Sequence, residues 1–116
     1  MTNRHIIHKL AQLGDRLDKP RDVHHWLYFH SAASRNQFKA RVQQDGFQIV
    51  DQADQENKYR LRIARAETVE LLAISDVTDF LVRTAEQHDG EYDGWETMVV
   101  KPGRFLSGLK RMLGRA

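Results

Sequence analysis

The chain has 116 residues, of which 41% are hydrophobic and 29% charged, as expected for a single globular domain with no room for a separate substrate domain. It contains no cysteine, which excludes disulfides, thiolate zinc sites and cysteine catalysis. The N-terminus has no apolar signal-peptide core, and no window is apolar over the length that a membrane span needs, so we expect a cytoplasmic protein.

The positive charge is concentrated at the C-terminal end. Residues 101–116 hold five of the 18 basic residues and no acidic one, which leaves 13 basic against 16 acidic residues and a formal charge of −3 on residues 1–100. We therefore expect a mildly acidic domain over 1–100 and a separate basic tail over 101–116. The tail pattern predicts an amphipathic helix that suits an anionic membrane surface, nucleic acid or a partner groove. Its apolar side would carry Phe105, Leu109, Met112 and Leu113.

The first half of the chain predicts a helix, a strand and a second helix. Apolar residues at helical spacing form the stripe of an N-terminal helix that ends at "DKPRD": Ile6, Leu10, Leu13 and Leu17. The β-branched and aromatic run "VHHWLYFH" (23–30) predicts a strand. Ser31 is suited to cap a helix that runs to about Asp45, and Gly46 to end it in a left-handed conformation, with Phe47 folding back onto Val42.

The second half predicts three strands and one helix. "FQIVDQ" (47–52) is a short strand, and "KYRLRIARA" (58–66) alternates apolar and polar residues as a half-exposed strand does. A longer helix is expected at roughly 70–88, ended by "HDG", and "EYDGWETMVV" (91–100) is the last strand. The order α–βαββαβ–α predicts a ferredoxin-like α+β sandwich: two helices on one face of a four-stranded antiparallel sheet in the order 4-1-3-2. The other face needs a cover, which is solvent, the N-terminal helix or a partner.

Histidines are the first candidates for metal ligands, and strand geometry argues against them. His24 and His25 point to opposite faces of their strand, while His24 and His30 share a face about 20 Å apart. We therefore predict no metal site. His25 shares its face with Val23 and Leu27, so we expect it to be a buried, hydrogen-bonded histidine.

Two carboxylates, Glu91 and Asp93, are the candidates for acid/base catalysis. At two-residue spacing they share one face of a strand, with α-carbons about 6.6 Å apart. So short a chain cannot build a deep cleft around them, and polar residues are typical of an edge strand, so we predict no catalytic residue. Gly94 is suited to mark a β-bulge that changes which side chains face inward. We expect at least one of the two carboxylates to accept a hydrogen bond, with His25 as the candidate donor.

The open face of the predicted sheet is a candidate nucleic-acid surface. Trp26 and Tyr28 alternate out of the first strand, beside Arg60 and Arg62 of the third, so the face could stack bases and hold phosphates of single-stranded RNA. "KYRLRIARA" lacks the glycine–aromatic pattern of RNA-recognition sheets. The competing interpretation is that the N-terminal helix covers Trp26 and Tyr28 with its apolar stripe.

Two blocks of the sequence, "HWLYF" (25–29) and "GEYDGWET" (90–97), resemble the regulator of ribonuclease E activity B (RraB) family. "DKPRDV" and "DGF" fall in the expected places between residues 6 and 100, and the basic tail lies outside the resemblance. The signature positions present here are His25, Trp26, Tyr28, Phe29, Gly90, Glu91, Tyr92, Asp93, Gly94 and Trp95.

The resemblance implies a non-catalytic α+β protein that needs no cofactor. It implies further that the protein binds ribonuclease E, or a related RNA-processing protein, and inhibits RNA processing and decay by acting on the enzyme. Direct binding of RNA through the open sheet face is the alternative. The resemblance does not assign the signature residues to the interface or to the fold.

Overall fold

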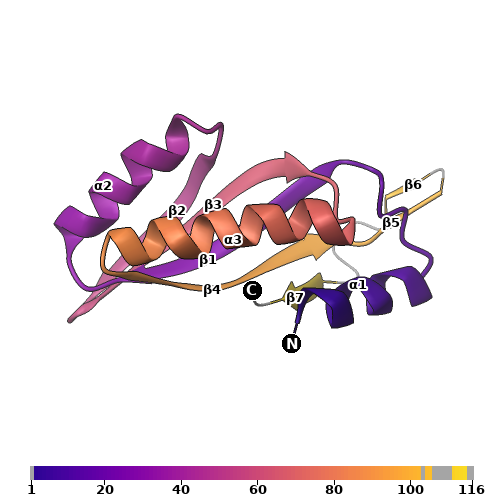
Figure 1. Ribbon diagram of the computed structural model, residues 1–116, viewed down its shortest axis with the longest axis horizontal. Coiled ribbons are helices and arrows are strands. Elements are labelled where there is room, and N and C mark those ends of the chain that lie inside the picture. The colour runs from indigo at the N-terminus through magenta and orange to yellow at the C-terminus, as the bar shows by residue number, and fades with distance from the viewer. Residues whose placement is uncertain (1, 103, 106–110, 115–116) are drawn as a thin grey trace.

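The computed structural model describes residues 2–102, 104–105 and 111–114 and shows an α+β protein (Figure 1). Helices and strands follow the order α1 (Asn3–Gln12), β1 (Arg21–Phe29), α2 (Ala32–Gln43), β2 (Gln48–Gln55), β3 (Lys58–Glu67), α3 (Leu71–Gln87), β4 (Gly90–Met98), β5 (Val100–Lys101), β6 (Arg104–Phe105) and β7 (Arg111–Gly114). Up to β4, each of these elements lies where the sequence pattern predicts it, with ends that differ by a few residues.

The main sheet is antiparallel with the order β2-β3-β1-β4-β7. Its first four strands have the predicted order. β7 is an unexpected fifth strand that pairs with residues 95–98 of β4, so β4 is not an edge strand along that half. The described parts of the tail are strands, since β5 and β6 form a separate two-stranded sheet. The predicted tail helix is therefore wrong at Phe105, Met112 and Leu113, while Leu109 lies outside the described residues.

The ends of α2 form as the sequence predicts. The Ser31 hydroxyl accepts a hydrogen bond from the Ser34 amide at 3.1 Å and so satisfies a free N–H at the start of the helix. Gly46 has φ +87°, a left-handed conformation that costs glycine little, and the Phe47 amide donates to the Val42 carbonyl at 3.2 Å. Phe47 is buried in the same cluster as Val42, which fixes the direction in which β2 starts.

The core lies between the sheet and α2 and α3. One buried cluster brings together side chains from the strands β1 and β3, the helices α2 and α3, and the residue before β2: Leu27, Phe29, Phe38, Val42, Phe47, Leu61, Ile63, Leu81 and Ala85. In β1 the buried residues alternate with partly exposed ones, because successive side chains of a strand point to opposite faces. The helices therefore cover one face of the sheet.

α1 packs on this helical face as well. It lies at the opposite end of the sheet from α2 (Figure 1). Its buried residues Ile6, Ile7 and Leu10 join a second cluster with Val23 of β1 and Trp95 of β4, both of which point to the helical face. The expectation that α1 covers Trp26 and Tyr28 is therefore wrong: the stripe finds its apolar partners on the other side of the sheet.

A buried ion pair closes this end of the fold. Two guanidinium nitrogens of Arg21 donate to the two carboxylate oxygens of Asp15, at 2.8 and 3.1 Å. Asp15 also accepts the Val100 amide at 2.8 Å, and Arg21 donates to the carbonyls of Arg16, Lys19 and Met98. Every charge in the group is hydrogen-bonded, as burial requires. The loop after α1 is thus attached both to β1 and to the end of β4.

Candidate functional site

The two signature blocks lie side by side, because β1 pairs with β4 over nearly its whole length. The pairing shifts between Trp26 and Leu27, so Asp93 is an extra residue in β4 and Gly94, opposite Trp26, has φ +145°. The predicted bulge is confirmed. It allows Tyr92 and Trp95, three residues apart, to face the same side of the sheet, and both pack among the core residues. The bulge therefore determines which signature residues of β4 face the core and which face the opposite side of the sheet.

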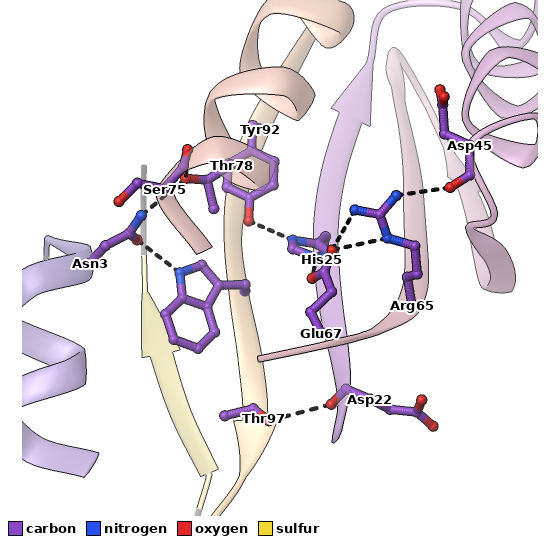
Figure 2. A network of polar contacts seen from close by, with 11 residues as sticks. Asn3, Asp22, His25, Asp45, Arg65, Glu67, Ser75, Thr78, Tyr92 and Thr97 are labelled. Carbon is purple, nitrogen blue, oxygen red and sulfur yellow. Dashed lines mark hydrogen bonds and ion pairs between the residues drawn. The ribbon is translucent and has the colours of Figure 1, made fainter. Parts of the chain in front are cut away.

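The core-facing signature residues form a buried polar network around His25 (Figure 2). His25 is fully buried; its Nδ1 lies 2.8 Å from the Tyr92 hydroxyl and its Nε2 3.2 Å from the Glu67 carboxylate. Glu67 is held in turn by Arg65, whose Nη2 donates to it at 2.8 Å. The Arg65 Nη1 donates to the Asp45 carbonyl at 2.8 Å, which ties the network to the end of α2. The prediction of a buried, hydrogen-bonded histidine is confirmed.

The partners of His25 determine its tautomer. A carboxylate can only accept, so Nε2 carries the proton that is donated to Glu67, and Nδ1 accepts the hydroxyl proton of Tyr92. Burial lowers the pKa of His25, although the hydrogen bond and the charge of Glu67 act in the opposite direction. Burial likewise raises the pKa of Tyr92, and the charge of Glu67 adds to that effect. Both groups are therefore neutral near pH 7, and their hydrogen bonds stabilise the packing of β1, β3 and β4.

The hydrogen bond suggested between His25 and Glu91 or Asp93 is not formed, because both ring nitrogens of His25 bond to Tyr92 and Glu67. The bulge also alters the geometry of the two acids. Glu91 is exposed opposite Tyr28, whereas Asp93 is the inserted residue, so the even spacing that placed them on one face does not apply. Within the described part of the chain, no three His, Cys, Asp or Glu side chains are grouped to hold a metal ion.

Trp95 attaches α1 to the sheet. Its indole N–H donates to the Asn3 side-chain oxygen at 2.9 Å, and the Asn3 amide donates to the Thr78 hydroxyl of α3 at 3.0 Å. Figure 2 shows the Asn3 side chain directed towards Thr78. Trp95 itself is fully buried. Trp95 therefore links α1 to β4 and, through Asn3, to α3.

The opposite face of the sheet carries the other signature residues. Trp26 and Tyr28 of β1 are partly exposed there, and none of the described helices covers them. The guanidinium carbons of Arg60 and Arg62 lie 5.4 and 4.9 Å from the centre of the Trp26 ring, and Lys58 Nζ lies 4.1 Å from that of Tyr28. The sequence thus predicted correctly that these aromatic and basic residues are neighbours. We call this surface the open face.

The arginines of the open face are engaged by acids as well as by Trp26. Arg62 lies 2.8 Å from Asp51 of β2 and 3.9 Å from Glu96 of β4, and Arg60 lies 3.8 Å from Asp51. Asp51 reaches them because β2 has its own register shift after Ile49, which places Asp51 opposite Arg62. The face is therefore a mixed charged surface in which the arginine charge is partly neutralised.

A hollow of ≈ 670 Å³ lies at one end of the open face. It is lined by Pro20, Arg21, Asp22, His24, Arg62, Ala66, Glu96, Thr97 and Met98. In the pairing of the strands, Ala66 lies opposite Asp22, while Ala64 and Glu96 flank His24. β3 changes from arginines at 60 and 62 to alanines at 64 and 66, and these small side chains leave the space open.

Sequence reasoning missed the residues that complete these sites. Glu67 is 42 residues from His25, and Asn3 is 92 residues from Trp95, so no local pattern connects them. A usable signal was the two-residue spacing of Arg65 and Glu67, which places both side chains on one face once the strand is extended by one residue beyond its predicted end at 66. Asp51 could not be found either, because its position depends on the bulge in β2.

Comparison with known proteins places the whole arrangement in context. The family model described as "Regulator of ribonuclease activity B" (RraB) matches residues 1–97. The match covers the elements from α1 to nearly the end of β4 and stops before the basic tail. The search among curated proteins gives no match. None of the described helices is long and apolar enough to cross a membrane.

Proposed function

Because this chain belongs to the regulator of ribonuclease activity B family, we propose that it binds ribonuclease E and lowers its activity on RNA by protein–protein contact. The family regulates ribonuclease activity and is not catalytic, so no chemistry is required of the chain itself. The observation that carries the proposal is the match over residues 1–97, which includes both signature blocks. We place the protein in the cytoplasm, where ribonuclease E acts on RNA.

The two faces of the sheet divide the signature residues by role. His25, Tyr92, Gly94 and Trp95 hold the fold together through the buried network, the bulge and the attachment of α1. Trp26, Tyr28 and Glu91 belong to the open face. A partly exposed tryptophan beside arginines is the composition that protein interfaces favour at their centres. We therefore assign partner contact to the open face and architecture to the helical face.

A cleavage assay tests the function. Ribonuclease E is incubated with a labelled RNA and rising amounts of the chain, and the same is done with an enzyme that lacks its non-catalytic C-terminal region. We expect slower cleavage by the full enzyme and no effect on the truncated one. A complex captured on immobilised enzyme at low salt should accompany the inhibition. Unchanged cleavage together with no complex at low salt would rule the function out.

A second candidate, binding of single-stranded RNA through Trp26, Tyr28, Arg60 and Arg62, is favoured by one observation: α1 leaves this face uncovered. Against it, both arginines are already paired with Asp51 and lie against the Trp26 ring, so a stacking base has to displace them. Titration with an oligoribonucleotide decides. Quenching of tryptophan fluorescence that is lost in a Trp26→Phe variant supports RNA binding, and unchanged fluorescence excludes it.

A further inference from the structure

The positive charge of the chain gathers at one end of the molecule. Residues 1–20 hold four Lys and Arg residues against two Asp, and residues 101–116 hold five against no acid. These two segments together have a formal charge of +7, while residues 21–100, with nine basic and fourteen acidic residues, have −5. Figure 1 shows α1 and β7 next to each other, at the end of the sheet away from α2. The described parts of the two segments therefore share one surface, which we call the basic end.

Backbone contacts hold the two segments together. The Arg16 amide, in the loop after α1, donates to the Val100 carbonyl at 2.7 Å, so the tail begins beside that loop. Further along the chain, β7 pairs with β4 and contacts α1. Asp93 and Glu96 belong to the strand that receives β7, and counting both against the basic end still leaves it at +5. The excess of positive charge is thus a property of the fold and not of the tail alone.

α1 presents its basic residues on the side that faces away from the core. The helix contains no acidic residue, and its apolar side is buried. At about 100° per residue, the four basic positions fall within an arc of about 140° on the other side: Arg4, His5, His8 and Lys9. Three of them are exposed and Lys9 is partly exposed. None of the four forms an ion pair with an acid among the described residues, so these groups can bind an external anion, unlike the arginines of the open face.

A nucleic-acid backbone suits this surface better than a bilayer or a folded protein does. α1 buries its apolar side against Val23 and Trp95, so that side cannot enter a membrane. The helix also exposes no large hydrophobic residue of the kind found at the centre of protein interfaces. Phosphate groups need only positive charge and hydrogen-bond donors, which guanidinium, ammonium and imidazole groups supply.

We propose that the basic end binds the phosphate backbone of single-stranded RNA, with Arg4 and Lys9 of α1 and the basic residues of the tail making the contacts. Such binding is independent of base sequence and weakens as the salt concentration rises. The choice of RNA as the polyanion rests on the proposed function, because a regulator of a ribonuclease works where RNA is bound. Residues 21–100 are acidic and repel the same backbone, so the RNA would lie across the basic end and leave the open face to the enzyme.

Charge-neutralising variants of the full chain test the site. Arg4→Gln/Lys9→Gln removes two positive charges from α1 and keeps the helix, because glutamine is a good helix former. Arg41→Gln/Arg83→Gln is the matched control, since it changes the net charge equally at exposed positions of α2 and α3, outside the basic end. Circular dichroism of each variant checks that it is folded.

Binding is measured by the fluorescence anisotropy of a labelled oligouridine of about 15 nucleotides at several salt concentrations. For the natural chain, the logarithm of the affinity should fall linearly with the logarithm of the salt concentration, with a slope of about 0.7 for each phosphate neutralised. Arg4→Gln/Lys9→Gln should weaken binding at least about fivefold and reduce that slope by about 1.4, and Lys101→Gln/Arg111→Gln in the tail should act in the same way. The control should change the affinity less than about twofold, and Trp26→Phe should leave it unchanged.

Two further measurements separate the RNA site from the proposed function. Nuclease-treated ribonuclease E should bind Arg4→Gln/Lys9→Gln as tightly as the natural chain, and vesicles of anionic phosphatidylglycerol should not bind the chain at a salt concentration at which RNA does. Absence of RNA binding at low salt, binding that the α1 and control variants weaken equally, or binding that Trp26→Phe abolishes overturns the basic end as an RNA site. Binding of vesicles in place of RNA overturns RNA as its ligand. RNA binding at the basic end without any complex with ribonuclease E overturns the proposed function and keeps the site.

Discussion

Replacing Tyr92 with phenylalanine tests the structural role of the signature residues. The ring of Tyr92 packs against both core clusters, and phenylalanine keeps those contacts. Only the hydroxyl is lost, which lies 2.8 Å from Nδ1 of the fully buried His25. The substitution leaves that nitrogen without a donor in a site that water does not reach. Loss of one partner from a buried hydrogen bond costs about 1–3 kcal/mol of unfolding free energy.

This cost is measurable by urea denaturation, which gives the unfolding free energy, and by thermal denaturation, both followed by circular dichroism. For a domain of this size, about 4 °C of melting temperature corresponds to 1 kcal/mol, so Tyr92→Phe should melt about 4–12 °C lower than the natural chain. Tyr28→Phe is the control, because Tyr28 is partly exposed on the open face and its change should stay within about 0.5 kcal/mol. Equal stability of the two variants would refute a network that supports the fold.

Three further changes have defined outcomes. Burial lowers the pKa of His25 from 6.5, so below that pH the unfolded chain binds more protons than the folded one. The unfolding free energy should therefore fall as the pH drops below about 6.5, by up to about 1.4 kcal/mol per pH unit. The His25→Gln variant should show a smaller slope in urea denaturation at several pH values. Gly90→Ala should lower stability by about 1–3 kcal/mol in the same assay, because the new Cβ would lie 2.4 Å from the Phe29 ring; a stable variant contradicts this packing. Asp15→Asn should cost about 3–5 kcal/mol by leaving the buried Arg21 charge without its partner, and a cost under 1 kcal/mol would contradict it.

The order of elements could be predicted because its signals are local. β1 shows the two-residue period that places Val23, His25 and Leu27 in the core, and α2 has both a capping serine and a terminal glycine. These patterns depend on neighbours in the sequence. The order of the first four strands followed from the order of the elements together with the right-handedness of the crossover connections. The burial of His25 followed from the same alternation.

The faces of β4 and the place of α1 could not be predicted in this way. In β4 the inserted Asp93 changes the phase of the alternation, so Tyr92 and Trp95 both point inward at a spacing of three. The helical period identified the apolar stripe of α1 but not the surface that receives it. That surface is formed by Val23 and Trp95, which come together only when β1 pairs with β4. Contacts between distant segments decide both features.

The strands of the tail could not be predicted from its sequence for a different reason. Its apolar residues have a helical period, yet β7 pairs with residues 95–98 of β4. An exposed strand edge offers free backbone donors and acceptors, and pairing with it outweighs the helical preference of a short segment. The open edge of β4 is therefore what gives this part of the tail its structure, and the sequence of the tail alone does not contain that information.

Equilibrium binding of the chain to nuclease-treated, full-length ribonuclease E tests the account most directly. Calorimetry should show a saturable complex in the absence of RNA, and Trp26→Ala on the open face should weaken it at least about tenfold, because a central tryptophan commonly contributes about 2 kcal/mol or more to an interface. Leu72→Ala is the control, since Leu72 is 81% exposed on α3 and should leave the affinity unchanged. Absence of a complex at low salt, or equal affinity of Trp26→Ala and the natural chain, would contradict binding through the open face.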